Sequence, residues 1–247
     1  LDGEEESQAV KGLDVSGDDF LEGMLADVNG DGYDDLVMAS PRSTSSERFV
    51  LWAALSTGDG FAEFTQVYES DQARAKSIYP GDFDGDGDDD IVLVDADGET
   101  TEMLTSDGAA YSSTWRGNNG GHNFDDAEVG DFDRDGTEEL VFMSVFSGDN
   151  EQIAIARWAD GRWQDEIWFT AKGKSLDLLY GNPGTAVADV DGDGRDDVIR
   201  FSNVAGTQPR TIWVLTSDGK EFKKAQDWGT YVCECAEYFD DATSGLP

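Results

Sequence analysis

Short apolar runs alternate along the chain with acidic, glycine-rich segments, and this alternation occurs four times. In each repeat, a first apolar run follows the acidic segment and a second strand-like run comes after it. The first runs cover residues 36–39, 91–94, 140–145 and 198–201, and the second runs cover residues 48–55, 100–105, 152–158 and 210–216. Helical periodicity is not sustained over any long stretch, so these runs predict short β-strands.

An Asp-Gly pair follows every second run, at Asp59-Gly60, Asp107-Gly108, Asp160-Gly161 and Asp218-Gly219. Asp-Gly between strand-like runs indicates a tight hairpin, because glycine tolerates the positive φ angles of such turns. The next stretch begins with an aromatic residue, which is Phe61, Tyr111, Trp163 or Phe222. Together with the run that leads into the next acidic segment, each repeat predicts about four short strands joined by turns.

The acidic segments themselves align without gaps. They read ADVNGDGYDDLVM (residues 26–38), GDFDGDGDDDIVL (81–93), GDFDRDGTEELVF (130–142) and ADVDGDGRDDVIR (188–200). They lie about 50 to 60 residues apart, which is too long for helical hairpin repeats and fits one multi-stranded sheet per repeat. The sequence therefore predicts an all-β fold, a β-propeller built of four-stranded antiparallel blades. A β-sandwich and a stacked β-solenoid are the alternatives.

We expect one repeat domain over residues 1–247, with blade-like repeats at approximately 20–70, 76–117, 124–172 and 184–230. Four repeats fit a closed small propeller, an open blade array or part of a larger propeller. Residues 231–247 are expected to form a closing strand or the start of a further blade. A closing strand would pair with residues 8–15 and protect the sheet edges that an open propeller exposes.

Oxygen-bearing side chains stand at positions 1, 3, 5 and 9 of each acidic segment, counted from its leading aspartate, and glycine stands at position 6. These side chains are Asp27, Asn29, Asp31 and Asp35; Asp82, Asp84, Asp86 and Asp90; Asp131, Asp133, Asp135 and Glu139; and Asp189, Asp191, Asp193 and Asp197. Position 7 varies freely, which suggests that its backbone carbonyl is the ligand. The residues there are Tyr33, Asp88, Thr137 and Arg195.

Carboxylates this close together repel one another, and a hard divalent cation offsets that cost. Calcium accepts an all-oxygen shell of flexible geometry, whereas magnesium demands a strict octahedron and retains waters. The pattern begins like an EF-hand loop, but it lacks the bidentate Glu at position 12 and no flanking helices are visible. A metal site between two strands is therefore predicted. Solvated Asp-Gly turns are the alternative, and four matches in the same register make it a poor one.

At these residues the chain resembles the FG-GAP/VCBS repeat family, which includes the blades of integrin α-subunit propellers and many bacterial surface proteins. Residues 81–93 match the family signature closely, and the resemblance covers roughly residues 20–230. It implies a β-propeller with Ca²⁺ in the loop between the first two strands of each blade, hence about four ions. It also implies that the residues given above for positions 1, 3, 5, 7 and 9 are the ligands. Family propellers usually have more blades than the four repeats seen here.

The composition excludes several classes of function. Acidic residues number 54 against 17 basic ones, which gives a formal net charge of -37. Such a surface disfavours binding to nucleic acids and to anionic membranes. No apolar run approaches the roughly 18 residues of a membrane span. The excess acid is typical of a solvated, self-repelling surface, and a cation-rich partner is the alternative.

Four aromatic residues recur near the ends of the last strand-like run of each repeat, namely Tyr68, Trp115, Trp168 and Trp228. They predict either core packing or a ligand-binding face that stacks on sugar or protein. The polar loop of residues 116–123 carries His122, the one histidine, which is a candidate ligand contact and more typical of an exposed side chain than of a catalyst. Cys233 and Cys235 lie two residues apart in a strand-like run, so their side chains would point the same way but sit too far apart for an easy disulfide. A strained bridge, free thiols and an intermolecular link all stay open.

Three functions fit these features. The first is a calcium-stabilised binding or adhesion module, secreted or at the cell surface, that presents propeller loops to a carbohydrate or protein ligand. The second is the propeller domain of a polysaccharide-degrading lyase or hydrolase, and the third is a structural module of a larger surface protein. Outside the metal loops, no spacing singles out a catalytic pair, so a binding module without catalytic residues is the prediction. The first residues, LDGEEESQ, are polar and show no signal peptide, which leaves open one removed earlier.

Overall fold

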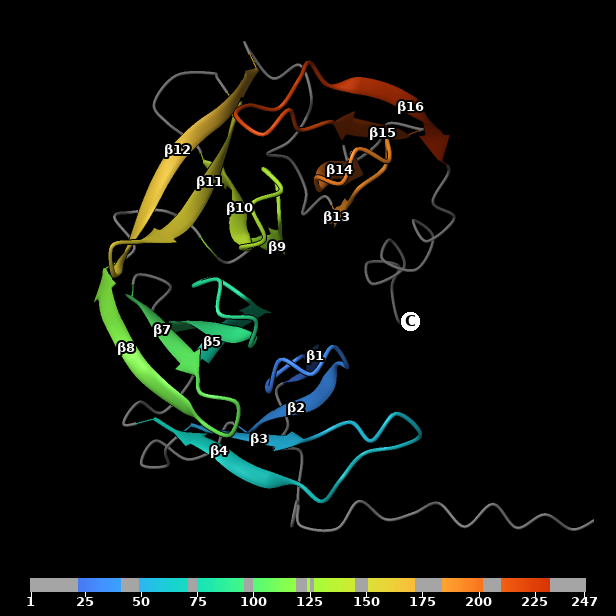
Figure 1. The fold of residues 1–247 in the computed structure, drawn as a ribbon. Coiled ribbons are helices and arrows are strands. Elements are labelled where there is room, and N and C mark those ends of the chain that lie inside the picture. Colours follow the sequence, from blue (N-terminus) through green and yellow to red (C-terminus); the bar gives the residue numbers. More distant parts are fainter. Residues whose placement is uncertain are drawn as a thin grey trace, which may run out of the picture. The chain divides into compact units, whose positions relative to one another are not determined.

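Strands make up nearly all of the regular structure in the part of the chain that the structure describes (Figure 1). The structure, a computed structural model, describes residues 22–40, 49–70, 75–95, 100–118, 124, 127–144, 151–171, 184–201 and 210–231. Within these residues sixteen strands form four sheets of four strands each. No helix in this part of the chain is long and apolar enough to cross a membrane.

Each sheet takes its strands from one stretch of sequence, in chain order. The first sheet holds β1 (Glu22–Ala26), β2 (Asp35–Ser40), β3 (Val50–Ala54) and β4 (Thr65–Glu69), and the second holds β5 (Ala75–Gly81), β6 (Asp90–Asp95), β7 (Thr100–Ser106) and β8 (Tyr111–Asn118). The third holds β9 (Glu128–Gly130), β10 (Glu139–Ser144), β11 (Glu151–Ala159) and β12 (Arg162–Ala171), and the fourth holds β13 (Thr185–Ala188), β14 (Asp197–Phe201), β15 (Arg210–Leu215) and β16 (Gln226–Tyr231). Neighbouring strands pair antiparallel in every described register.

This architecture confirms the predicted fold class, because a four-stranded antiparallel sheet with strands in chain order is the blade of a β-propeller. The apolar run after each acidic segment forms the second strand of its sheet. In the second sheet this strand, β6, is buried along five of its six residues. The last strand is more exposed, as the mixed burial of β8 and β12 shows.

The chain divides into two compact units. The first unit comprises Leu1–Val129, Gly136–Leu140 and Ala156–Gln164, and the second comprises Gly130–Asp135, Val141–Ile155 and Asp165–Pro247, so the third sheet contributes to both. In the first unit a core cluster joins the first two sheets and includes Val28, Leu51, Ile91 and Leu104. The second unit has its own cluster, which includes Phe132, Ile153, Trp168, Val198 and Phe222.

Tight turns join the third and fourth strands as predicted, and in two repeats the strand pairing is interrupted just beyond the turn. At Asp160-Gly161 the turn has two residues with φ angles of 55° and 71°, as a type I′ hairpin requires. In the first and fourth repeats the aromatic residue after the Asp-Gly pair forms only an isolated bridge, between Ser56 and Phe61 and between Ser217 and Phe222. Strand pairing resumes further along the chain, where β4 begins at Thr65 and β16 at Gln226.

Several predictions fall on residues outside the described part of the chain. These are the closing or further strand at residues 232–247, its pairing with residues 8–15, the candidate contact His122 and the state of Cys233 and Cys235. The boundaries of the single repeat domain stay a prediction.

Candidate metal centre

The four acidic segments form the loops between the first and second strands of the sheets, at residues 27–34, 82–89, 131–138 and 189–196. We refer to them as loops 1 to 4. Position 9 of each segment is the first residue of the second strand, so the strand fixes where its carboxylate lies. The loop and the sheet are therefore built as one unit.

The carboxylate at position 1 organises each loop from inside. In loop 2, Asp82 accepts hydrogen bonds at Oδ1 from the N–H groups of Gly85 and Asp86, at 2.8 and 3.1 Å, and at Oδ2 from Gly87 at 3.0 Å. Asp189 accepts the corresponding three bonds in loop 4, at 2.7, 3.1 and 2.9 Å. These three N–H groups also lower the pKa of Asp189 below its usual value, with Gly194 the largest cause. The loop backbone thus favours the charged carboxylate.

Two positions in each loop adopt left-handed backbone geometry. Position 6 is glycine throughout, as the sequence indicated, with φ between 83° and 94°. Position 4 is left-handed as well, and there three loops carry glycine while loop 3 carries Arg134 at a φ of 64°. The bends at both positions turn the carboxylates at positions 1, 3 and 5 toward one another.

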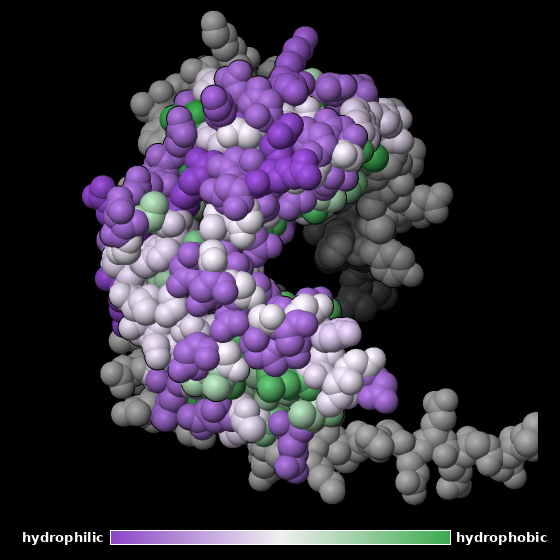
Figure 2. Space-filling view, in the orientation of Figure 1, coloured by the Kyte–Doolittle hydropathy of each residue, from purple (hydrophilic) through white to green (hydrophobic). Residues whose placement is uncertain are grey.

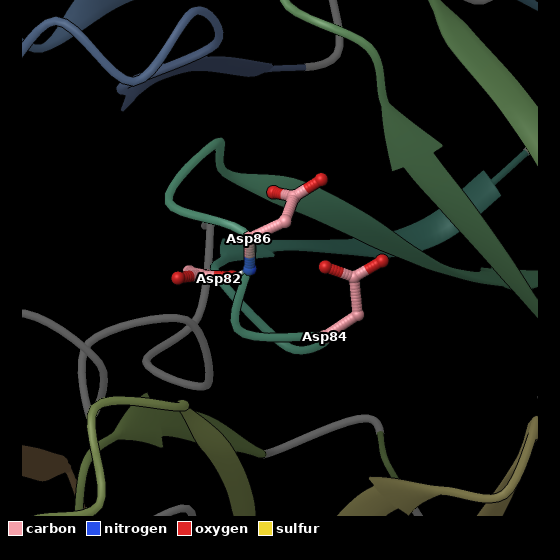
Figure 3. A group of neighbouring side chains, drawn as sticks. All are labelled: Asp82, Asp84 and Asp86. Carbon is pink, nitrogen blue, oxygen red and sulfur yellow. Dashed lines mark hydrogen bonds between the residues drawn. The ribbon is translucent and has the colours of Figure 1, made fainter.

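Three of the loops gather carboxylate oxygens closely enough to share one cation. The groups are Asp82, Asp84 and Asp86; Asp131, Asp133 and Asp135; and Asp189, Asp191 and Asp197, each with ligand atoms within 4.8 Å of one another. Figure 3 shows the first group, in which the carboxylate of Asp84 extends toward that of Asp86. In loop 1 the amide of Asn29 takes the place of the third carboxylate, and the Asn29 and Asp27 oxygens both accept the N–H of Asp31 at 3.0 Å.

The carboxylate at position 9 is buried in all four repeats, with exposed fractions of 0 to 1%. Asp35 and Asp197 use both oxygens to accept backbone N–H groups from their own sheet. Asp90 differs, because Oδ1 accepts the N–H of Ser106 at 3.0 Å while the buried Oδ2 has no hydrogen-bond partner. A buried carboxylate oxygen without a partner is costly, and the negative charges of Asp82, Asp84 and Asp86 act on the same carboxylate, so a cation in loop 2 would offset that repulsion. The residues of loop 2 therefore fit a bound metal.

Burial and neighbouring charge also raise the pKa of acids in loop 2. Burial, followed by the charges of Asp84, Asp86 and Asp82, raises the pKa of Asp90 to about 8. The pKa of Asp89 rises to about 6, again mainly through burial. Both groups hold a proton more tightly than an ordinary aspartate, whose pKa is 3.8. In the absence of a cation, loop 2 is thus an electrostatically strained site.

These shifts predict how stability depends on pH. Without calcium, the folded state binds more protons than the unfolded state between about pH 4 and pH 8, so the free energy of unfolding falls as the pH rises through this range. The protein in EGTA is therefore expected to melt at a higher temperature at pH 5 than at pH 8. Saturating calcium, which competes with the protons, should abolish or reverse this trend. Thermal melts along a pH series measure both, and a flat profile in EGTA would contradict the shifts.

Loop 4 differs from the others around position 5. The carboxylate of Asp193 pairs with the guanidinium of Arg195, and the Asp193 carbonyl accepts a hydrogen bond from Arg134 of loop 3 at 2.9 Å. The side chain of Arg134 also lies against Gly194, where a Cβ would come within 2.8 Å of its guanidinium carbon. The acidic group of loop 4 accordingly draws on Asp197 instead of Asp193.

The structure places the four predicted aromatic contacts in different surroundings. The Tyr68 hydroxyl donates to Glu102 at 3.1 Å, and burial followed by the Glu102 charge raises the pKa of Tyr68 to about 12. Trp115 is half-buried and packs edge-on against Trp158, with ring centroids 5.9 Å apart. Trp168, at 4% exposure, lies in the core of the second unit, which favours the packing interpretation, whereas Trp228 is 51% exposed.

Sequence reasoning missed the acid at position 8, which is Asp89 in loop 2, Glu138 in loop 3 and Asp196 in loop 4. Each accepts a hydrogen bond from the leading aspartate of the preceding loop. The recurrence of Asp or Glu at this position was a visible signal, but its partner lies in another repeat.

Each repeat is a four-stranded antiparallel sheet, and the loop between its first two strands carries oxygen-bearing side chains at alternate positions. This arrangement is typical of a propeller blade with a candidate metal-binding loop. A sequence profile described as FG-GAP-like repeat matches residues 27–93 and 131–200, which together make up more than half of the chain. The chain belongs to the FG-GAP-like repeat family, as the resemblance predicted.

Comparison with solved structures gives a more distant match. A rhamnogalacturonan lyase of Bacillus licheniformis aligns with 84% of this chain at 14% sequence identity and a TM-score of 0.42. The chain spans half the length of that lyase. Among curated proteins, none matches the chain.

Proposed function

We propose that the chain is a calcium-stabilised extracellular binding module, in which metal loops fix the sheets and the surface presents side chains to a carbohydrate or protein ligand. The observation that carries the calcium assignment is the Asp82–Asp84–Asp86 group, together with the unpartnered buried oxygen of Asp90 at the end of the same loop. A bound Ca²⁺ would neutralise these carboxylates and tie positions 1, 3, 5, 7 and 9 together. The ligands in the other loops are the residues at the same positions, except that in loop 4 Asp193 pairs with Arg195 and the carboxylates of Asp189, Asp191 and Asp197 form the group.

Calcium suits these loops better than magnesium. The ligands are carboxylate, amide and carbonyl oxygens on a loop with two left-handed bends, which gives a shell of flexible geometry. Weak all-oxygen sites of this kind fill at the millimolar calcium found outside cells. The extracellular location rests on this argument and on the family.

The negative charge of the protein restricts the class of ligand that it can bind. At a formal net charge of -37, the protein repels acidic polymers, so a neutral glycan or a basic protein surface is the favoured partner. Hydrophilic residues predominate over the described part of the face in Figure 2. The exposed indole of Trp228 on β16 offers a flat apolar surface of the kind that stacks on sugar rings.

Glycan-array binding with calcium and with EGTA tests this function. We expect calcium-dependent binding to neutral glycans without cleavage, and a loss of affinity of about tenfold or more in Trp228→Ala. Ile167→Ala is the matched control, because Ile167 is also exposed, at 45%, on an outer strand. Cleavage of a bound glycan would show that the chain is an enzyme and would contradict the proposed binding module. Absence of binding to glycans and to basic proteins would favour a structural role.

A further inference from the structure

The loops of successive sheets are joined by reciprocal hydrogen bonds. In the first pair, the N–H of Asp27 donates to the Asp89 carboxylate at 2.7 Å, and the N–H of Asp89 donates to the Asp27 carbonyl at 2.7 Å. Asp82 and Glu138 make the same two bonds, each at 2.9 Å, and Asp131 and Asp196 make them at 3.0 and 2.9 Å. Position 1 of one loop is thus held by position 8 of the next in all three successive pairs.

A serine adds a second link in two of these pairs. The Ser106 hydroxyl donates to the carbonyl of Val28, at position 2 of loop 1, at 2.7 Å, while its N–H donates to Asp90 of loop 2. Ser217 does the same between Phe132 of loop 3 and Asp197 of loop 4, with the hydroxyl bond at 2.5 Å. Both serines are buried, so the links lie away from solvent.

The residue before position 1 shows how closely the loops approach. A Cβ added to Gly81 would come within 2.4 Å of Glu138 Oε2, and one added to Gly130 would come within 2.8 Å of Asp196 Oδ2. The carboxylate at position 8 therefore packs against the backbone of the preceding loop. Asp89, Glu138 and Asp196 are partly buried, which strengthens these bonds relative to exposed ones.

We propose that the acids at position 8 are positioning residues that couple metal binding in successive loops, so that calcium in one loop raises the calcium affinity of its neighbour. This inference rests on the proposed calcium function. The carboxylate at position 1 is a proposed metal ligand of its own loop, and it also accepts hydrogen bonds from backbone N–H groups of that loop. Position 8 stands between the ligands at positions 7 and 9 of the next loop. Ordering either loop therefore fixes part of the other, and the coupling acts equally in both directions.

Calcium titration followed by hydrogen exchange of each loop tests the coupling. In Asp84→Ala, which removes a ligand of loop 2 and leaves the link to loop 1 intact, the calcium midpoint for protection of residues 27–35 is expected to rise about fivefold or more. Asp89→Ala removes the carboxylate acceptor and leaves the backbone bond and the Ser106 link, so adding Asp84→Ala should shift that midpoint clearly less than it does in the otherwise unchanged protein. In Asp89→Asn, which keeps an acceptor oxygen, the dependence on Asp84 should return.

Two controls separate coupling from other effects. Asp107→Asn removes a nearby negative charge and keeps the oxygen that accepts the N–H groups of Ala109 and Ala110, so it should leave the coupling intact. Ser106→Ala removes the second link alone and should reduce the coupling in part. If Asp84→Ala in the otherwise unchanged protein left the calcium midpoint for protection of loop 1 unchanged, the proposed coupling would be overturned. If no loop gained protection with calcium, the calcium proposal would fail first, and the coupling with it.

Discussion

Chelating calcium with EGTA is expected to lower the melting temperature of the protein by roughly 10 °C. A single site at a hundredfold excess of ligand over its Kd contributes about 2.7 kcal/mol. For a chain of this size, each kcal/mol shifts the melting temperature by about 2 to 4 °C. One filled site accounts for most of the expected fall, and further sites would add to it.

The fall follows from what the loops lose without a cation. Their carboxylates then repel one another, and the Asp90 oxygen stays buried without a partner. Magnesium at the same concentration should restore less of the stability, because its octahedral shell fits the loop less well. Identical melting curves in calcium and in EGTA would contradict this prediction.

The second large effect is expected from Phe132→Ala. Phe132 stands at position 2 of loop 3, is fully buried and packs edge-on against Phe222, with ring centroids 5.6 Å apart. Removing a buried phenyl ring costs about 3 to 5 kcal/mol through lost burial and the cavity left behind. Since the residue sits beside a metal ligand, the variant should also bind calcium more weakly at loop 3.

The matched control for this variant is Phe61→Ala. It removes the same atoms from a ring that is 50% exposed, and its effect on the free energy of unfolding should stay within about 1 kcal/mol. Denaturant titrations of both variants in calcium provide the measurement. Equal destabilisation by the two substitutions would contradict the prediction that the buried ring of Phe132 stabilises the fold.

The metal loops could be predicted from the sequence because their determinants are local. Alternate oxygen side chains and the glycine at position 6 lie within nine residues, and four copies in the same register exposed the pattern. The sheets followed from the apolar runs beside the loops. Position 4 was overlooked because Arg134 interrupts the glycines there, although its backbone is left-handed like theirs.

The links between loops could not be predicted in the same way. Asp27 and Asp89 are 62 residues apart, and nothing near either residue indicates its partner. The interruption of strand pairing before β4 and β16 was not predicted either, because the Asp-Gly pair and the following aromatic residue recur in all four repeats, whereas the interruption does not. For the same reason, the burial of Trp168 and the exposure of Trp228 emerge only from the fold.

Calorimetric titration of the EGTA-treated, dialysed protein with calcium measures how many ions the loops bind. We expect about four Ca²⁺ ions per chain, as one oxygen-lined loop per repeat requires. We also expect Asp84→Ala to lower this number or to weaken one site. Heats indistinguishable from dilution at millimolar calcium would contradict the metal assignment and the function built on it.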